Sequence, residues 1–214
     1  MELNKQKALT CFLFIVYILK FTSTVLPYTH MQKPTYCQYC AGQTPDNLHR
    51  IYHDTAYGFA IDSDTELFER LVLEINQAGL SWGTILAKQA NFKKAFHNFN
   101  IKKVASYTDT DRQRLLNDIG IIRNRLKIDA AIHNAQVILH AQKTHGSFKN
   151  WIHAHHPREK PEWVKLFKQT FKFTGGEITG EFLMSIGYLP GAHTADCPVY
   201  KKILKTKPVW NTYK

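Results

Sequence analysis

Hydrophobic residues along most of the chain recur at helical rather than strand spacing. Between residues 63 and 80, five apolar residues lie on one face of a helix: Leu67, Phe68, Leu71, Val72 and Ile75. Ser63 or Asp64 can cap the start of this helix, and Gly79 can end it. Similar patterns predict helices over 82–99, 101–107, 108–120, 122–146, 147–156, 161–173 and 178–189. Alternation typical of strands is nearly absent, so we predict an all-α fold.

One predicted connection between helices has the features of an anion site. The stretch "RLLNDIGIIRNRLKIDAAI" reads as a helix, a short turn containing Gly120, and a second helix. Arg123, Arg125 and Lys127 lie at the start of the second helix, where free backbone N–H groups also attract anions. A helix-hairpin-helix that grips a DNA phosphate is built in this way, although an ordinary helical hairpin could carry the same charges in solvent.

The overall charge points to a polyanionic partner. The 214 residues carry a formal net charge of +11, which favours nucleic acid or an anionic membrane surface. A hydrophobic fraction of 44% and an aromatic fraction of 13% are typical of a folded core and exclude a disordered chain. The length allows one domain or at most two.

The cysteines favour metal binding over disulfides. Four cysteines, unevenly spread, are too few for a disulfide framework. His193 and Cys197 are four residues apart, one turn if the segment is helical. Candidate partners lie in "YCQYCAGQTPDNLHRIYHD": Cys37, Cys40, His49 and His53. Spacing leaves open whether Cys37 with Cys40, or Cys40 with His53, completes a site, and four protein ligands would make that site structural.

The N-terminal segment "ALTCFLFIVYIL", residues 8–19, is apolar but short for a membrane span. It has the charged start and apolar centre of a signal peptide, without a clear cleavage site. Translation starting at Met31 is a third interpretation. We expect residues 1–30 to lie outside the fold and 31–214 to form the domain. A membrane anchor through residues 8–19 remains the alternative to a cytoplasmic protein.

Five segments together resemble the DNA-3-methyladenine glycosylase I family. They are "YHDTAYG", "LFERLVLEINQAGLSW", "IGIIRNRLKI", "FKFTG" and the pair His193 and Cys197. They occur in one order over nearly the whole globular region, and "E-x-x-Q-A-G-L-S-W" from Glu74 to Trp82 is specific. The resemblance implies a helix-hairpin-helix glycosylase bundle that hydrolyses the N-glycosidic bond of 3-methyladenine in alkylated double-stranded DNA. It implies a cytoplasmic monomer without stable membrane association.

The resemblance also assigns roles to individual residues. Its structural zinc pattern falls on four residues near the two ends of the domain: Cys40, His53, His193 and Cys197. Its glutamate falls on Glu74 as the catalytic residue, with Tyr52 and Trp82 as rings that hold the extruded cationic base.

The departures from the family concern the outer pocket wall and the hairpin. Family tryptophans fall on Gly42 and Tyr57, and another aromatic position falls on His49. The resemblance thus implies that Tyr57 and His49 bind the base together with Tyr52 and Trp82. Leu126 replaces a small residue in the hairpin region, which affects how closely DNA approaches. No lysine is placed to form a Schiff base, so we expect no strand cleavage. The alternative function is a non-catalytic, zinc-stapled DNA-binding module, which would not need an aromatic pocket beside an acid.

Overall fold

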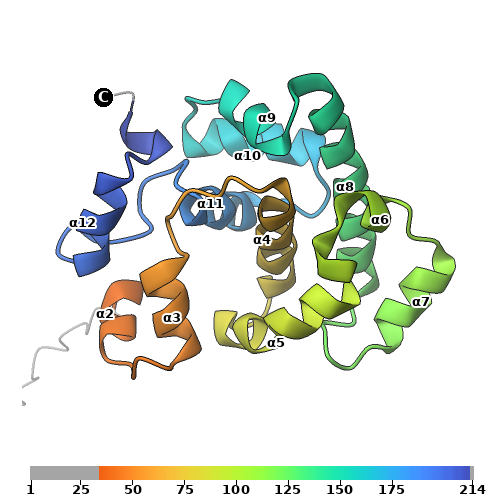
Figure 1. Ribbon diagram of the computed structural model, residues 1–214, viewed down its shortest axis with the longest axis horizontal. Helices are drawn as coiled ribbons and strands as arrows, with labels where there is room; N and C mark the ends of the chain where they lie inside the picture. Colours follow the sequence, from red (N-terminus) through yellow and green to blue (C-terminus); the bar gives the residue numbers. More distant parts are fainter. Residues whose placement is uncertain (1–33, 213–214) are drawn as a thin grey trace, which may run out of the picture. The chain divides into compact units, whose positions relative to one another are not determined.

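The computed structural model describes residues 34–212, and these form a helical domain (Figure 1). The expectations for residues 1–30, including the anchor at 8–19, lie outside the described residues. No strand occurs between residues 34 and 212, which confirms the all-α prediction for this part of the chain. The elements are α2 Tyr36–Ala41, α3 Leu48–Thr55, α4 Asp64–Gln77, α5 Trp82–Ala95, η1 His97–Phe99, α6 Ile101–Ala105, α7 Asp109–Asn117, α8 Arg125–His145, α9 Phe148–Ala154, α10 Lys160–Thr170, α11 Gly176–Ser185, α12 Pro198–Lys205 and η2 Val209–Asn211.

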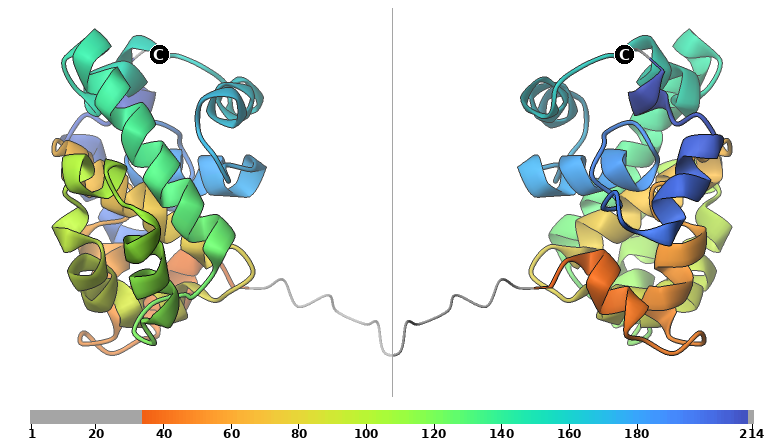
Figure 2. Two further views of the ribbon diagram at one scale, coloured as in Figure 1. Left: turned by 90° about the vertical axis from the view of Figure 1, so that its right-hand side faces the viewer. Right: turned by 90° about the vertical axis from the view of Figure 1, so that its left-hand side faces the viewer.

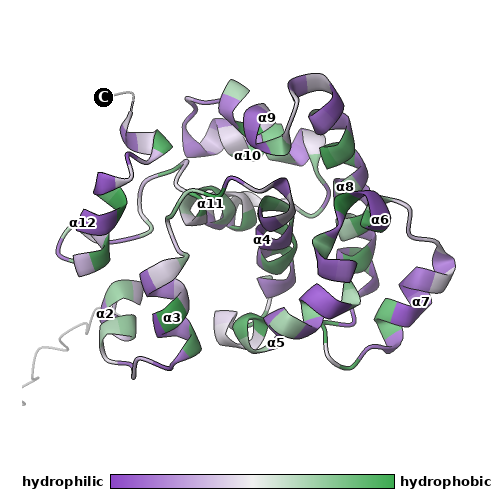
Figure 3. Cartoon of the chain, viewed as in Figure 1, coloured by the Kyte–Doolittle hydropathy of each residue, from purple (hydrophilic) through white to green (hydrophobic). Residues whose placement is uncertain are grey.

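Helix α4 is the centre of the domain. It packs against α5, α8, α9 and α11 (Figure 1), and it carries both hydrophobic and hydrophilic positions (Figure 3). Most of its apolar side chains are fully buried. Ser63 caps its first turn by accepting from the N–H of Glu66, as predicted. Because neighbours cover α4 on several sides, its polar residues Glu69, Glu74 and Asn76 are buried as well. This position removes Glu74 from bulk water.

Helix α8 is the longest helix and runs along one side of the domain (Figure 2). It starts at Arg125 rather than at residue 122, because Asn124 caps it by accepting from the N–H of Lys127. Gly146, with a φ of 81°, ends it as predicted. The preceding residues therefore belong to the turn after α7.

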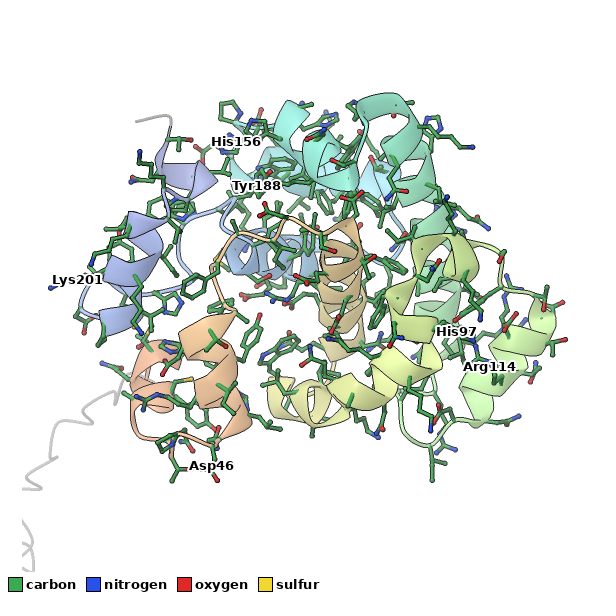
Figure 4. All side chains as sticks on the ribbon, viewed as in Figure 1. Asp46, His97, Arg114, His156, Tyr188 and Lys201 are labelled. Atoms are coloured by element: carbon green, nitrogen blue, oxygen red, sulfur yellow. The ribbon has the colours of Figure 1, made fainter. Side chains whose placement is uncertain are left out.

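The helix predicted over 82–99 ends early, at Ala95. His97, Asn98 and Phe99 all have positive φ values near 50°, so the backbone turns left-handed there and cannot continue the helix. Arg114 of α7 holds this end in place, because its guanidinium donates to the carbonyl of Ala95 at 2.9 Å (His97 and Arg114 are labelled in Figure 4). The turn brings α7 beside the end of α5.

The two ends of the described chain supply three helices that the apolar pattern did not predict: α2, α3 and α12. Contacts between Cys37 of α2 and His193, and between Cys197 and His53 of α3, hold these ends together. Among residues 34–212, none of the helices has the length and apolar character needed to cross a bilayer.

Candidate functional site

A cavity of about 240 Å³ lies where α3, α4, α5 and α11 meet. Three of the predicted base-binding residues, Tyr52, Tyr57 and Trp82, line it together with the predicted catalytic Glu74. The remaining lining residues are Tyr36, Gln77 and Glu181. The wall is therefore mainly aromatic, with two carboxyl groups and one amide. Such a lining suits a flat, polar and positively charged ring.

Glu74 is the buried acid of this cavity. It is 4% exposed, and burial raises the pKa of its carboxyl to about 8. Arg70 on the same helix lowers this pKa, while the charge of Glu181 raises it further. A carboxyl group poised in this way binds a proton or an opposite charge more readily than an exposed glutamate does.

Tyr52 and Trp82 form one aromatic corner of the cavity, with ring centroids 5.0 Å apart. Arg70 fixes Tyr52, because its guanidinium donates to the phenol oxygen at 3.1 Å and lies 5.0 Å from the ring centroid. The indole Nε1 of Trp82 is buried and has no hydrogen-bond partner within residues 34–212. A buried N–H without a partner is costly, so this group is an exception among the buried polar groups of the domain.

Three cavity residues were missed by the sequence interpretation. Tyr36 precedes the segments that resemble the family, and no pattern marked it. Gln77 lies one turn after Glu74 on α4, a spacing that could have indicated it. Glu181 had a visible signal, because it is an isolated acid in the apolar stretch "ITGEFLMSIGYL". The hydroxyl of Tyr57 donates to Glu181 Oε2 at 3.0 Å.

His49 does not line the cavity, although it was predicted to bind the base. Its Nδ1 lies 3.2 Å from the hydroxyl of Tyr36, and a Cβ on Gly83 would come within 2.8 Å of its Nε2. His49 is thus wedged between α2 and the start of α5. It supports Tyr36, which takes the place on the wall that had been expected for His49.

Four buried side chains converge between the ends of the domain: Cys37, His53, His193 and Cys197. Their ligand atoms all lie within 4.8 Å of one another. Cys197 Sγ is 3.5 Å from His193 Nδ1 and 3.6 Å from His53 Nε2, and Cys37 Sγ is 3.7 Å from His193 Nδ1. Bonds of about 2.0–2.3 Å in a tetrahedral zinc shell place neighbouring ligand atoms about 3.3–3.8 Å apart. The group could therefore hold a zinc ion.

The prediction of Cys40 as a ligand is wrong in this structure. Cys40 is buried, but its thiol points to the carbonyl oxygen of His49, 3.6 Å away. Cys37, one turn earlier on α2, occupies the fourth position instead. His193 and Cys197 also do not share a helix turn: His193 lies in a loop, and Cys197 is the N-cap of α12.

The two histidines of this group have their outer nitrogens engaged. His193 Nε2 lies 2.8 Å from the carbonyl oxygen of Tyr57, and His53 Nδ1 lies 2.7 Å from Asp54 Oδ1. A carbonyl oxygen can only accept, so His193 carries its proton on Nε2 and presents Nδ1 as a free lone pair. Carbonyl and carboxylate partners of this kind orient histidines that bind metals. All three described cysteines are unpaired, as this role requires.

In the region of the predicted hairpin, helices α7 and α8 are joined by a turn that contains Gly120. Asp118 accepts from the N–H of Gly120 at 2.8 Å, and Lys88 donates to the carbonyl of Gly120 at 3.1 Å. A Cβ on Gly120 would come within 2.9 Å of Asp118 Oδ1 and 3.2 Å of Asn91 Cβ, so a larger residue would have to displace these side chains. Arg123 and Arg125 are exposed beside this turn.

Lys127, which was predicted to contact a phosphate, does not share that exposed position. It is 5% exposed, and its ammonium donates to the carbonyl oxygens of Asn76 at 2.9 Å and Ala78 at 2.7 Å. These carbonyls end α4 and need donors from outside the helix. Lys127 therefore joins α8 to the end of α4. Leu126 instead is 68% exposed next to Arg125.

A family model, curated relatives and solved structures that are similar to this chain all belong to the same class of protein. The family described as methyladenine glycosylase matches residues 42–166. DNA-3-methyladenine glycosylase 1 of Escherichia coli (strain K12) is 34% identical over 180 residues, covering 75% of this chain and 96% of the relative. The DNA-3-methyladenine glycosylase of Haemophilus influenzae is 34% identical over 178 residues, covering 74% and 96%. The structure of 3-methyladenine DNA glycosylase I from Staphylococcus aureus, solved to explain 3-methyladenine recognition, matches with a TM-score of 0.68 at 32% identity. The match covers 77% of this chain and 97% of that one.

Proposed function

The chain belongs to the methyladenine glycosylase family, which confirms the predicted resemblance, and we propose that it releases 3-methyladenine from alkylated double-stranded DNA. The observation that carries this proposal is the buried acid Glu74 in a cavity that the aromatic residues Tyr52, Tyr57 and Trp82 also line. The relatives named above are enzymes of this class, and a structure of 3-methyladenine DNA glycosylase I in complex with 3-methyladenine matches this chain with a TM-score of 0.67.

The chemistry of the substrate suits this cavity. A purine methylated at N3 is cationic while it is attached to the sugar, and it leaves as a neutral base. The nucleotide must first leave the duplex, because its base cannot be reached inside the stack. The rings of Tyr52 and Trp82 then hold the base, and Glu74 accepts from its amino group and balances its charge. Water attacks a sugar with oxocarbenium-like character, so an abasic site remains and the strand is not cut.

The exposed arginines support the proposed contact with the DNA backbone. Arg123 and Arg125 lie beside the turn at Gly120, close to the start of α8, where N–H groups favour anions. We assign the phosphate contacts of a helix-hairpin-helix to these residues and not to Lys127. The net charge of +11 adds attraction that weakens with salt.

The Cys/His group fits a structural zinc ion held by Cys37, His53, His193 and Cys197. Zinc would supply cross-linking between the ends of the domain and no step of hydrolysis, because four protein ligands leave no position for water. We further propose that the protein acts as a monomer in the cytoplasm, where reduced cysteines are available as ligands.

A base-release assay on methylated duplex DNA tests the proposal. We expect wild-type protein to release 3-methyladenine and Glu74→Gln to release it at least about tenfold more slowly, since an ion pair with the base is lost. Glu66→Gln, an exposed acid at the start of the same helix, is the matched control and should behave as wild type. DNA affinity that is intact in wild type without any base release would favour the non-catalytic alternative.

A further inference from the structure

Glu181 gives the cavity a second carboxyl group that the proposed function does not use. It projects from α11, whereas Glu74 comes from α4, and both line the same cavity. The neighbours of Glu181 on α11, Gly180 and Phe182, are buried, which anchors this part of the helix. The two acids therefore approach the cavity from different elements.

The charges around the cavity do not balance when both acids are ionised. No lysine, arginine or histidine is among the lining residues. The cation that acts on Glu74 is Arg70, whose guanidinium is already engaged with the hydroxyl of Tyr52 and the carbonyl of Ser185. Above about pH 8, where Glu74 is ionised as well, two carboxylates against one arginine leave one negative charge, and a ligand carrying one positive charge would neutralise it.

The contact of Glu181 with Tyr57 leaves acceptor capacity for a ligand. Tyr57 donates its hydroxyl to Oε2, and no other residue between 34 and 212 hydrogen-bonds to the carboxyl group. A carboxylate has about four lone-pair sites, so several stay available. Tyr57 is buried and fixes where this charge lies.

We propose that Glu181 is a specificity-determining residue that makes the cavity select cationic purines over neutral ones. This inference rests on the proposed function, because it concerns the base that the same cavity would hold. Normal adenine and its N3-methylated form share their shape over most of the ring, whereas they differ by a full charge. The carboxylate of Glu181 attracts the positive charge of the methylated base. This attraction does not depend on the hydrogen bonds that the base makes with Glu74.

Binding of two small bases tests this selection without DNA. The cationic probe is 3,9-dimethyladeninium, in which the N9 methyl group stands in for the sugar. The neutral probe is free 3-methyladenine at about pH 8. Isothermal titration of each probe into wild-type protein gives the ratio of the two dissociation constants, and we expect the cation to bind more tightly.

The informative variant is Glu181→Gln, which keeps an acceptor for Tyr57 and removes only the charge. We expect its affinity for the cation to fall about tenfold, the low end of what an opposite charge within about 4–6 Å supplies, because Glu181 is partly exposed. Affinity for neutral 3-methyladenine should change less than about twofold by the same reasoning. Glu177→Gln, an acid whose side chain is 90% exposed on the same helix, is the matched control.

The possible results separate this inference from the proposed function. Equal losses for both probes in Glu181→Gln, or no loss for the cation, would overturn the selection by charge. If wild-type protein releases 3-methyladenine from DNA in that case, the proposed function stands alone. Wild-type protein that binds neither probe overturns the inference, and the base-release assay then decides the proposed function separately. A melting temperature for Glu181→Gln near that of wild type shows that the fold is intact.

Discussion

The burial of Glu74 should make the protein less stable as the pH rises, and Glu74→Gln should remove this dependence. The pKa of Glu74 is raised from 4.5 to about 8, with burial as the largest cause. Between these two values the folded protein holds a proton on Glu74 that the unfolded chain releases. Folding stability therefore falls as pH rises through this window, and the loss is complete above the folded pKa.

The size of the effect follows from the shift. The displacement from 4.5 to about 8 corresponds to about 5 kcal/mol of lost stability well above pH 8, at 1.36 kcal/mol for each pKa unit. By the same linkage, the loss of folding stability is about 1 kcal/mol at pH 5 and about 3 kcal/mol at pH 7. Glutamine carries no charge at any pH. The stability of Glu74→Gln relative to wild type should therefore rise by about 3–4 kcal/mol between pH 5 and pH 8.5.

Urea unfolding of both proteins at several pH values between 5 and 8.5 measures this difference. Tryptophan fluorescence reports the transition, and Glu66→Gln serves as the control whose difference from wild type stays constant. A flat difference for Glu74→Gln would show that Glu74 is ionised in the folded protein at low pH, and the account of its burial would then be wrong. In activity, kcat/KM of wild type should rise with pH and level off above about 8, because the ionised carboxylate pairs with the cationic base.

Three further outcomes concern the metal and the hairpin. Cys37→Ser should lose bound zinc, measured by metal analysis, whereas Cys40→Ser keeps it; the opposite result would restore Cys40 as the ligand. Lys127→Met should lower the free energy of unfolding by about 1–3 kcal/mol, because two buried carbonyls lose their donor, and a stability equal to wild type would contradict this. Arg125→Gln should leave stability nearly unchanged and remove about one phosphate contact from DNA binding. The slope of log affinity against log salt concentration should become shallower by about one unit, and an unaltered slope would refute this contact.

The main helices could be predicted because their apolar residues follow a single period. The pattern of α4 from Leu67 to Ile75 matches the structure, and Ser63 marks its start in both. The extent of burial could not be predicted in the same way. Glu74 is buried because α11 packs over the flank of α4, and α11 is far away in sequence. Local periodicity carries no information about such a neighbour.

The ends of helices were predicted less well, for reasons of local backbone geometry. Asn124 starts α8 because its side chain accepts from the backbone, a preference that competes with helix continuation before it. The turn at His97 depends on three successive residues with positive φ, none of which is glycine. Tertiary contacts such as that of Arg114 with Ala95 favour this turn. The conformational preferences of the residues in the turn do not predict it.

The choice between Cys37 and Cys40 shows what spacing cannot decide. Both thiols lie on α2, three residues apart and both buried, so each is close to α3. Which of them faces His53 depends on how α2 is rotated. The contacts of Tyr36 favour the observed rotation, because its ring packs edge-on against His49, His53 and Tyr57. The family pattern counts residues along the chain, whereas this rotation depends on a side chain that lies before the pattern begins.

The same tyrosines join the Cys/His group to the cavity, which links stability to base recognition. The carbonyl oxygen of Tyr57 accepts from His193 Nε2, while its hydroxyl donates to Glu181 inside the cavity. The ring of Tyr36 packs against the ring of His53 in a T-shaped arrangement, and Tyr36 also lines the cavity. The Cys/His group therefore contacts two aromatic residues of the cavity wall, Tyr36 and Tyr57. Because the positions of Tyr57 and Glu181 depend on each other, the charge that distinguishes a cationic purine is held in place by the same contacts that close the two ends of the domain.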